Sequence, residues 1–166
     1  MTITFHPDGR VTGSHLILNK PGSIIQTVTG TTSSRVSSTS TGSWVDTTLK
    51  TNISLTNANN NVLIMVTGSM YTQNTVTAAL TVFRGGTSGT NLEPGTATYG
   101  LQHFGDADDS YYATSVGFLD TGINTTNSTE YLVKIRKISG NAGLGAFFPS
   151  LPGRDQPMIQ LMEIAV

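Results

Sequence analysis

Segment 21–55 constrains the fold most, because its apolar residues follow the two-residue period of a strand and not the period of a helix. In the second half of the segment, Leu49, Ile53 and Leu55 alternate with polar residues, which predicts a half-buried strand. A disordered linker is excluded, because bulky apolar residues recur throughout and Pro21 is the only proline. We expect strands near 23–29, 34–39, 43–47 and 49–56.

The rest of the chain has the same character. Residues 61–71 form a near-continuous apolar run after an Asn-rich turn, which predicts a strand buried on both sides. Further strands are expected at 76–84, 96–101, 111–121, 129–138 and 158–166. No segment has the period of an amphipathic helix, and consecutive strands exclude βαβ units. The expected fold is therefore all-β, a jelly-roll β-sandwich of about 8–10 antiparallel strands.

The first twenty residues are distinct from this body. Pro7, Asp8 and Gly9 form a tight-turn signal between short apolar pairs, and Pro21-Gly22 separates the segment from the rest of the chain. We expect residues 1–20 to form an arm or hairpin for attachment or oligomer contact, with an extra edge strand as the alternative. Residues 21–166 are expected to form the single jelly-roll domain.

Composition excludes several classes of partner. The net charge is −1 and only 11% of the residues are charged, so the chain lacks the clustered Lys and Arg that nucleic acid or an anionic membrane surface requires. Thr, Ser and Asn make up about a third of the chain, which favours strands and polar turns. There is no Cys and no apolar run as long as a membrane span. The first residues lack a basic and an apolar region, so we expect no signal peptide.

Catalytic motifs are missing as well. No G-x-S-x-G is present, "GNAGLG" lacks the dinucleotide-binding order, and the three histidines form no metal-binding pair. A polysaccharide-cleaving enzyme would need paired carboxylates, and Asp106 cannot be paired with Glu93, Asp120 or Glu163 from sequence. We therefore expect a protein that is not an enzyme and uses no cofactor.

Two local clusters could bind a ligand. Asp106, Asp108 and Asp109 offer hard oxygen ligands that Ca²⁺ could use, although the loop lacks the pattern of an EF-hand and a solvated turn is the simpler interpretation. Tyr111 and Tyr112 are adjacent in an expected strand and so point to opposite faces. One of them is expected to be exposed or interfacial, where its ring could stack on a host glycan.

Several motifs resemble a segment common in virion proteins of tailed bacteriophages. The marks are PGSIIQ (21–26), a Ser/Thr-rich stretch ending in WVDT (44–47), NVLI (61–64), FRGG (83–86) and the terminal MEIAV, preceded by ITFHPDGRV (3–11). The resemblance covers most of residues 20–166. It implies a compact jelly roll, similar in style to the C1q and tumour-necrosis-factor heads, assembled as a homotrimer on a phage particle.

The resemblance also implies a location and partners. Phage fibres carry a long shaft before such a head, whereas about 20 residues precede it here, which favours a capsid decoration (cement) or short head-fibre protein. The expected location is the virion, assembled in the host cytoplasm, and the expected partners are other copies of the chain and the major capsid protein or another virion protein. The alternative is a tail-fibre tip that recognises host surface glycans.

Two sets of residues are expected to make these contacts. The terminal strand is apolar on both sides, so one side should meet its own core and the other a neighbouring subunit. Its expected trimer-interface residues are Met158, Ile159, Leu161, Met162 and Ile164. The residues expected to attach the arm to the capsid, by adding a strand to a neighbouring sheet edge, are Ile3, Phe5, Leu16, Ile17 and Leu18.

Overall fold

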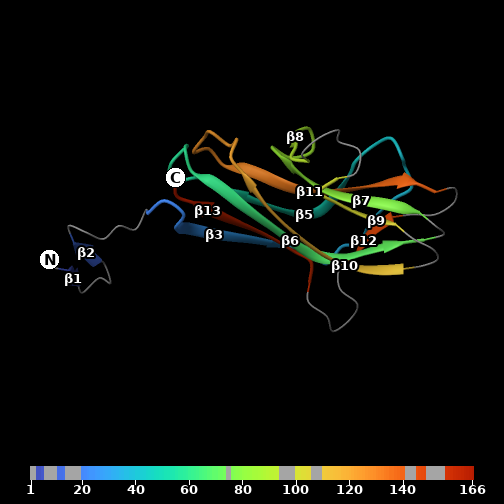
Figure 1. Cartoon of the computed structure of the whole chain (residues 1–166), viewed down its shortest axis with the longest axis horizontal. Coiled ribbons are helices and arrows are strands. Elements are labelled where there is room, and N and C mark those ends of the chain that lie inside the picture. Colours follow the sequence, from blue (N-terminus) through green and yellow to red (C-terminus); the bar gives the residue numbers. More distant parts are fainter. Residues whose placement is uncertain are drawn as a thin grey trace.

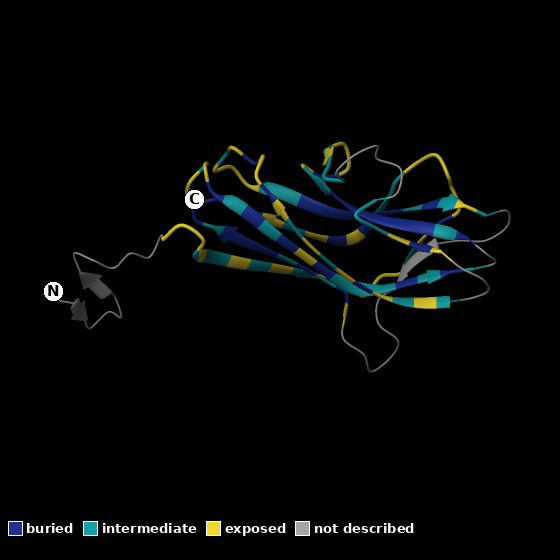
Figure 2. Ribbon diagram, in the orientation of Figure 1, coloured by how far each residue is buried: buried dark blue, intermediate teal, exposed yellow. Residues whose placement is uncertain are grey.

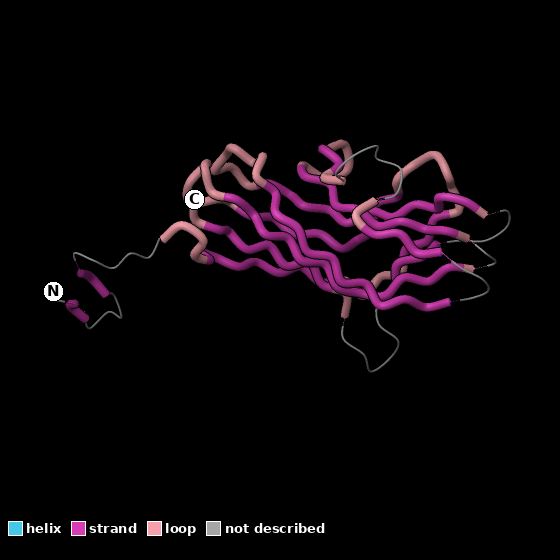
Figure 3. The backbone as a smooth tube through the Cα atoms, in the orientation of Figure 1, coloured by secondary structure: helices cyan, strands magenta, loops and turns pink. Residues whose placement is uncertain are grey.

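The chain folds into two antiparallel β-sheets packed face to face (Figure 1). The computed structural model describes residues 3–5, 11–13, 20–73, 76–93, 100–105, 110–140, 145–148 and 156–166, the segments 3–5, 11–13 and 145–148 by their backbone alone. Strands connected by loops account for all the described residues, and no helix occurs among them (Figure 3).

The first sheet is built around a long central strand, β6 (Asn61–Thr72). On one side β6 pairs along its whole length with β10 (Ser110–Asp120). On the other side it pairs first with β13 (Met158–Ile164), which in turn pairs with β3 (Ile24–Thr31). Beyond β13, the far end of β6 pairs with β12 (Gly145–Phe148), and β12 with β4 (Val36–Ser38).

The second sheet has the order β5-β11-β7, with two short strands beside β7. Its long members are β5 (Val45–Ile53), β11 (Thr129–Ser139) and β7 (Thr77–Arg84). The short members are β8 (Thr90–Asn91) and β9 (Gln102–Gly105). Most of the strand expected at 96–101 falls outside the described residues, and the strand that comes after it is β9.

The pairing has the winding of a jelly roll. The two halves of the chain run back along each other, so that β3 pairs with β13, β5 with β11, β6 with β10 and β7 with β9. The four pairs alternate between the two sheets, giving the orders β3-β13-β6-β10 and β5-β11-β7-β9. The expected all-β jelly-roll sandwich is confirmed.

The strands expected separately at 43–47 and 49–56 are one strand, β5. Its register against β11 shifts between Leu132 and Lys134, as at a β-bulge. Thr47 occupies this point: its hydroxyl donates to the carbonyl of Val133 at 2.6 Å and accepts from the N–H of Leu49 at 3.2 Å. The alternation keeps its phase through this point, because Val45, Leu49 and Ile53 all pack in or against the core. The sequence indicates two strands because the polar Thr47 occupies the core position between Val45 and Leu49.

The core lies between the sheets, where alternate residues of β5 and β6 are buried, whereas β7 and β11 each bury five consecutive residues (Figure 2). In β6 this set includes Val62, Ile64 and Val66, whereas Met65 between them is 37% exposed. The expectation that this strand is buried on both sides is therefore wrong for the single chain. The fully buried large residues of the core are Leu49, Ile53, Val62, Ile64, Met70, Leu80, Tyr131, Ile135, Ile159 and Leu161.

Residues 3–5 and 11–13 form β1 (Ile3–Phe5) and β2 (Val11–Gly13), a two-stranded antiparallel sheet of their own. Ile3 lies opposite Gly13 and Phe5 opposite Val11. Among the described strands, neither pairs with a strand of the body. The role of these residues as an arm for attachment stays a prediction, and Leu16, Ile17 and Leu18 lie outside the described residues.

Candidate interaction surface

The face of the first sheet that points away from the core has no charged side chain in its four-strand part. Cross-strand partners share a face, so the pairing of β3, β13, β6 and β10 defines its rows. The rows are Ile24-Ile164-Asn61, Thr27-Met162-Leu63-Leu119, Thr29-Gln160-Met65-Gly117 and Thr31-Met158-Thr67-Ser115. We call this set the outer face.

Large apolar side chains are exposed on the outer face. Ile24 is 56%, Leu119 49% and Met65 37% exposed. Further along the same side of the sheet, Tyr111 is 58% exposed and its ring centroid lies 4.8 Å from that of Tyr71. A contiguous apolar patch of this kind marks an interaction site more often than a solvated surface.

The opposite side of the sandwich is different in kind. On the second sheet, Lys134 forms an ion pair with Asp46 at 2.8 Å, and Lys50 forms one with Glu130 at 2.8 Å. Partial burial by itself would raise the pKa of Asp46. The hydrogen bonds and charge of Lys134 outweigh burial and lower that pKa. Cations also cover the aromatic rings on this side, since Lys134 lies 4.1 Å from the ring centroid of Phe83. The second sheet therefore has a charged, internally paired exterior.

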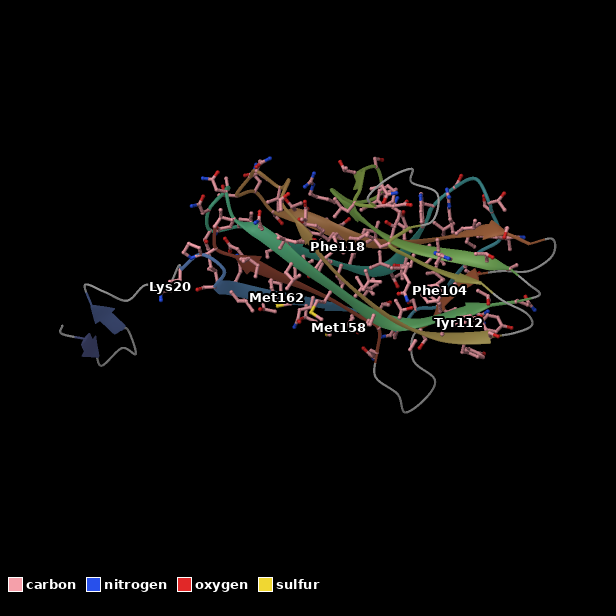
Figure 4. All side chains as sticks on the ribbon, in the orientation of Figure 1. Lys20, Phe104, Tyr112, Phe118, Met158 and Met162 are labelled. Atoms are coloured by element: carbon pink, nitrogen blue, oxygen red, sulfur yellow. The ribbon has the colours of Figure 1, made fainter. Side chains whose placement is uncertain are left out.

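The terminal strand divides its predicted interface residues between the two sides of the sheet. Ile159 and Leu161 are fully buried in the core of the chain itself. Met158, Met162 and Ile164 lie on the outer face, and the sticks of Met158 and Met162 extend from β13 away from the second sheet (Figure 4). Met162 is only 8% exposed there, so Met158 and Ile164, both partly exposed, are the two of the five that remain candidates for contact with another subunit.

The two tyrosines of β10 also point to opposite sides. Tyr112 faces the core, where its ring centroid lies 5.6 Å from that of Phe104 (Figure 4). Tyr111 lies on the solvent side beside Tyr71. Of the two residues predicted to contact a glycan, Tyr111 is exposed and Tyr112 is not, and the contact itself stays a prediction.

The carboxylates considered for catalysis lie in separate environments. Asp120 accepts hydrogen bonds from Arg84 at 2.7 Å and from the Tyr131 hydroxyl at 2.8 Å. Burial and this contact raise the pKa of Tyr131 far above its ordinary value. Glu163 lies opposite Val62 of β6, as Asp120 does on the other side of that strand, but it accepts from a separate set of uncharged donors, Asn60, Gln26 and Thr56. Glu93 accepts from the N–H of Gly100 at 2.8 Å.

The described part of the chain contains neither a candidate metal site nor a helix that could span a membrane. Within it, no three His, Asp or Glu side chains gather closely enough to hold a metal ion. Asp106, Asp108 and Asp109 lie outside it, so the Ca²⁺ candidate stays a prediction. The same residues include no helix that is long and apolar enough to cross a membrane.

No protein-family model and no curated protein matches the chain. Three similar solved structures are of infectious bursal disease virus: the Gt strain (15% identity, TM-score 0.41), the Gx strain (16%, 0.42) and a T13 viral particle (16%, 0.41). Each match covers 85% of this chain but only 38%, 37% and 35% of the respective viral chain. TM-scores below 0.5 do not establish a common fold, and they carry no conclusion about function.

Proposed function

We propose that this chain is a non-enzymatic structural protein of a virus particle, a homotrimer that decorates a phage capsid or forms a head fibre. The motifs that resemble those of tailed-phage virion proteins support a location on a phage particle. The outer face carries no charge and exposes Ile24, Met65 and Leu119 among uncharged polar side chains. This is the observation that carries the assembly, because exposed apolar side chains are stabilised when a second protein surface removes them from water. Packing of subunits through this face would bury Ile24, Met65 and Leu119 together.

The hairpin of β1 and β2 supports attachment through the arm. An isolated two-stranded hairpin is at best marginally stable in water, so it gains most when its strands join another sheet. Ile3 and Phe5 lie on β1, and strand addition to a capsid protein would use its backbone N–H and C=O groups. Three arms per trimer would act together through their effective concentration.

Mass measurement tests the trimer. Light scattering of the purified chain at micromolar concentration should give a multiple of three chains. Met65→Asp should lower the mass because it places an unpaired charge in the contact, and it should still fold because Met65 is exposed in the single chain. Asn52→Asp, on an exposed position of β5, is the matched control and should keep the mass. A Met65→Asp protein that keeps the wild-type mass contradicts this interface.

A second candidate function, recognition of a host glycan by a tail-fibre tip, is favoured by one observation. The Tyr71–Tyr111 pair presents aromatic rings at the end of the first sheet, and such rings pack well on sugar rings. Binding to host-envelope polysaccharide that is lost in Tyr111→Ala, and kept in the control Ala113→Ser, would favour this function over decoration.

A further inference from the structure

The edge of the first sheet formed by β10 is long and lacks the usual protection. β10 pairs with β6 over eleven residues without a shift in register, and no other described strand pairs with its second side. Natural edge strands are guarded by charges, prolines or bulges. The edge strand β5 of the second sheet has such guards, since it carries Asp46 and Lys50 and a register shift. In β10 no charged residue and no proline occurs before Asp120.

Apolar side chains are incompletely covered on both sides of this edge. Tyr112, Val116 and Phe118 point toward the core but are only partly buried. On the outer side, Leu119 is 49% exposed. A strand added beside β10 would cover both sets at once, and its backbone would satisfy the outward N–H and C=O groups of the edge with roughly ten hydrogen bonds.

The side-chain sizes along β10 identify the added strand. In an antiparallel pair of two β10 strands centred on Ser115, Tyr111 of one copy faces Leu119 of the other, and Ala113 faces Gly117. On the core side Tyr112 faces Phe118, and Thr114 faces Val116. Large residues thus meet large and small meet small at the nine positions from Tyr111 to Leu119, and Ser110 faces Asp120 at each end. Shifting the register by two residues in one direction would place Tyr112 opposite the buried carboxylate of Asp120.

We propose that β10 is a second, two-fold interface, through which two copies of the chain join their first sheets edge to edge with Ser115 on the axis. This contact is independent of the virion role and of the three-fold contact through the outer face. The edge contact alone gives two chains and the outer-face contact alone gives three, whereas both together give six. Closure of the edge in this way also removes the exposed strand that would otherwise promote aggregation.

Disulfide trapping tests the register directly, because the chain contains no cysteine. Residues directly opposite in an antiparallel pair have Cα atoms about 4.5–5.5 Å apart, within the range that a disulfide spans. In full-length Ser115→Cys, mild oxidation should therefore produce a covalent dimer on a non-reducing gel. The matched control is Ala113→Cys, whose two copies would lie four residues apart along the strands, about 13 Å, and should stay uncrosslinked.

Two results would overturn the proposal. One is a folded Ser115→Cys protein that yields no covalent dimer, and the other is equal crosslinking of Ser115→Cys and Ala113→Cys, which indicates random collision. A reversible assay gives a further readout: Ser115→Lys, which places like charges opposite each other, should weaken the two-fold contact by about tenfold or more in Kd. Ser115→Thr should keep it. If Met65→Asp lowers the mass of the assembly but leaves the Ser115→Cys crosslink unchanged, the two interfaces are independent of each other.

Discussion

Glu163 is the buried group whose replacement we expect to destabilise this fold through lost hydrogen bonds rather than lost packing. Its side chain is fully buried near the C-terminal end of β13. One carboxylate oxygen accepts from Asn60 Nδ2 at 2.7 Å and from the hydroxyl and N–H of Thr56 at 2.7 and 2.8 Å. The other accepts from Gln26 Nε2 at 2.5 Å. The carboxylate therefore joins β3, β13 and the turn before β6.

The cost of Glu163→Gln can be worked out from these four contacts. A hydrogen bond to a charged group contributes about 1.5–3 kcal/mol. The glutamine keeps one acceptor oxygen, but its NH₂ group would face the NH₂ of Gln26, donor against donor. Several donors lie at partly buried positions, where water compensates in part, so we expect a loss of about 3 kcal/mol in the free energy of unfolding.

The same group predicts a dependence on pH. Burial by itself would raise the pKa of Glu163, but the hydrogen bonds from Asn60, Gln26 and Thr56 outweigh burial and lower that pKa below its ordinary value of 4.5. A carboxylate whose pKa is lower in the folded state than in the unfolded state stabilises the fold. This contribution is complete at pH values above the pKa of the unfolded state, and it is lost as the pH falls through the pKa of the folded state. The gap in stability between wild type and Glu163→Gln should therefore be full at pH 7 and shrink below about pH 4.5.

Urea unfolding at a fixed chain concentration, at pH 7 and at pH 3, measures both effects. The control is Glu130→Gln, which removes the ion pair with Lys50. The Lys50 side chain is 54% exposed, so solvent screens this pair and its loss should change stability little. The reasoning is refuted if Glu163→Gln costs no more than Glu130→Gln at pH 7, or if its cost is the same at both pH values.

Three other substitutions or truncations test the remaining structure. Tyr131→Phe should cost about 1–3 kcal/mol in urea unfolding, because it leaves one buried oxygen of Asp120 without its donor. Leu161→Asp should unfold the chain in far-UV circular dichroism at 25 °C, not merely dissociate it, since Leu161 is fully buried in the core. A chain that starts at Pro21 should keep its circular dichroism spectrum and its mass but fail to bind particles that lack the native protein. Equal binding by the truncated chain would make the arm dispensable.

The strand content and the fold class could be predicted because they depend on local pattern. Alternation in β5 and β11, the Asn-rich turn before β6 and the absence of any helical period already indicate an all-β sandwich. The opposite directions of Tyr111 and Tyr112 result from the same period of two. The low charge of the chain likewise predicts that nucleic acid is not a partner.

The sites depended on contacts between distant residues. Glu163 meets Asn60 and Gln26, and Arg84 meets Asp120, yet nothing near any of these residues in the sequence indicates its partner. Period two shows that Met158 and Met162 share one side of β13 and Ile159 and Leu161 the other. It cannot show which side meets the second sheet, because both are apolar. That choice was decided by the packing of the two sheets, and it determines which apolar residues became core and which form the outer face.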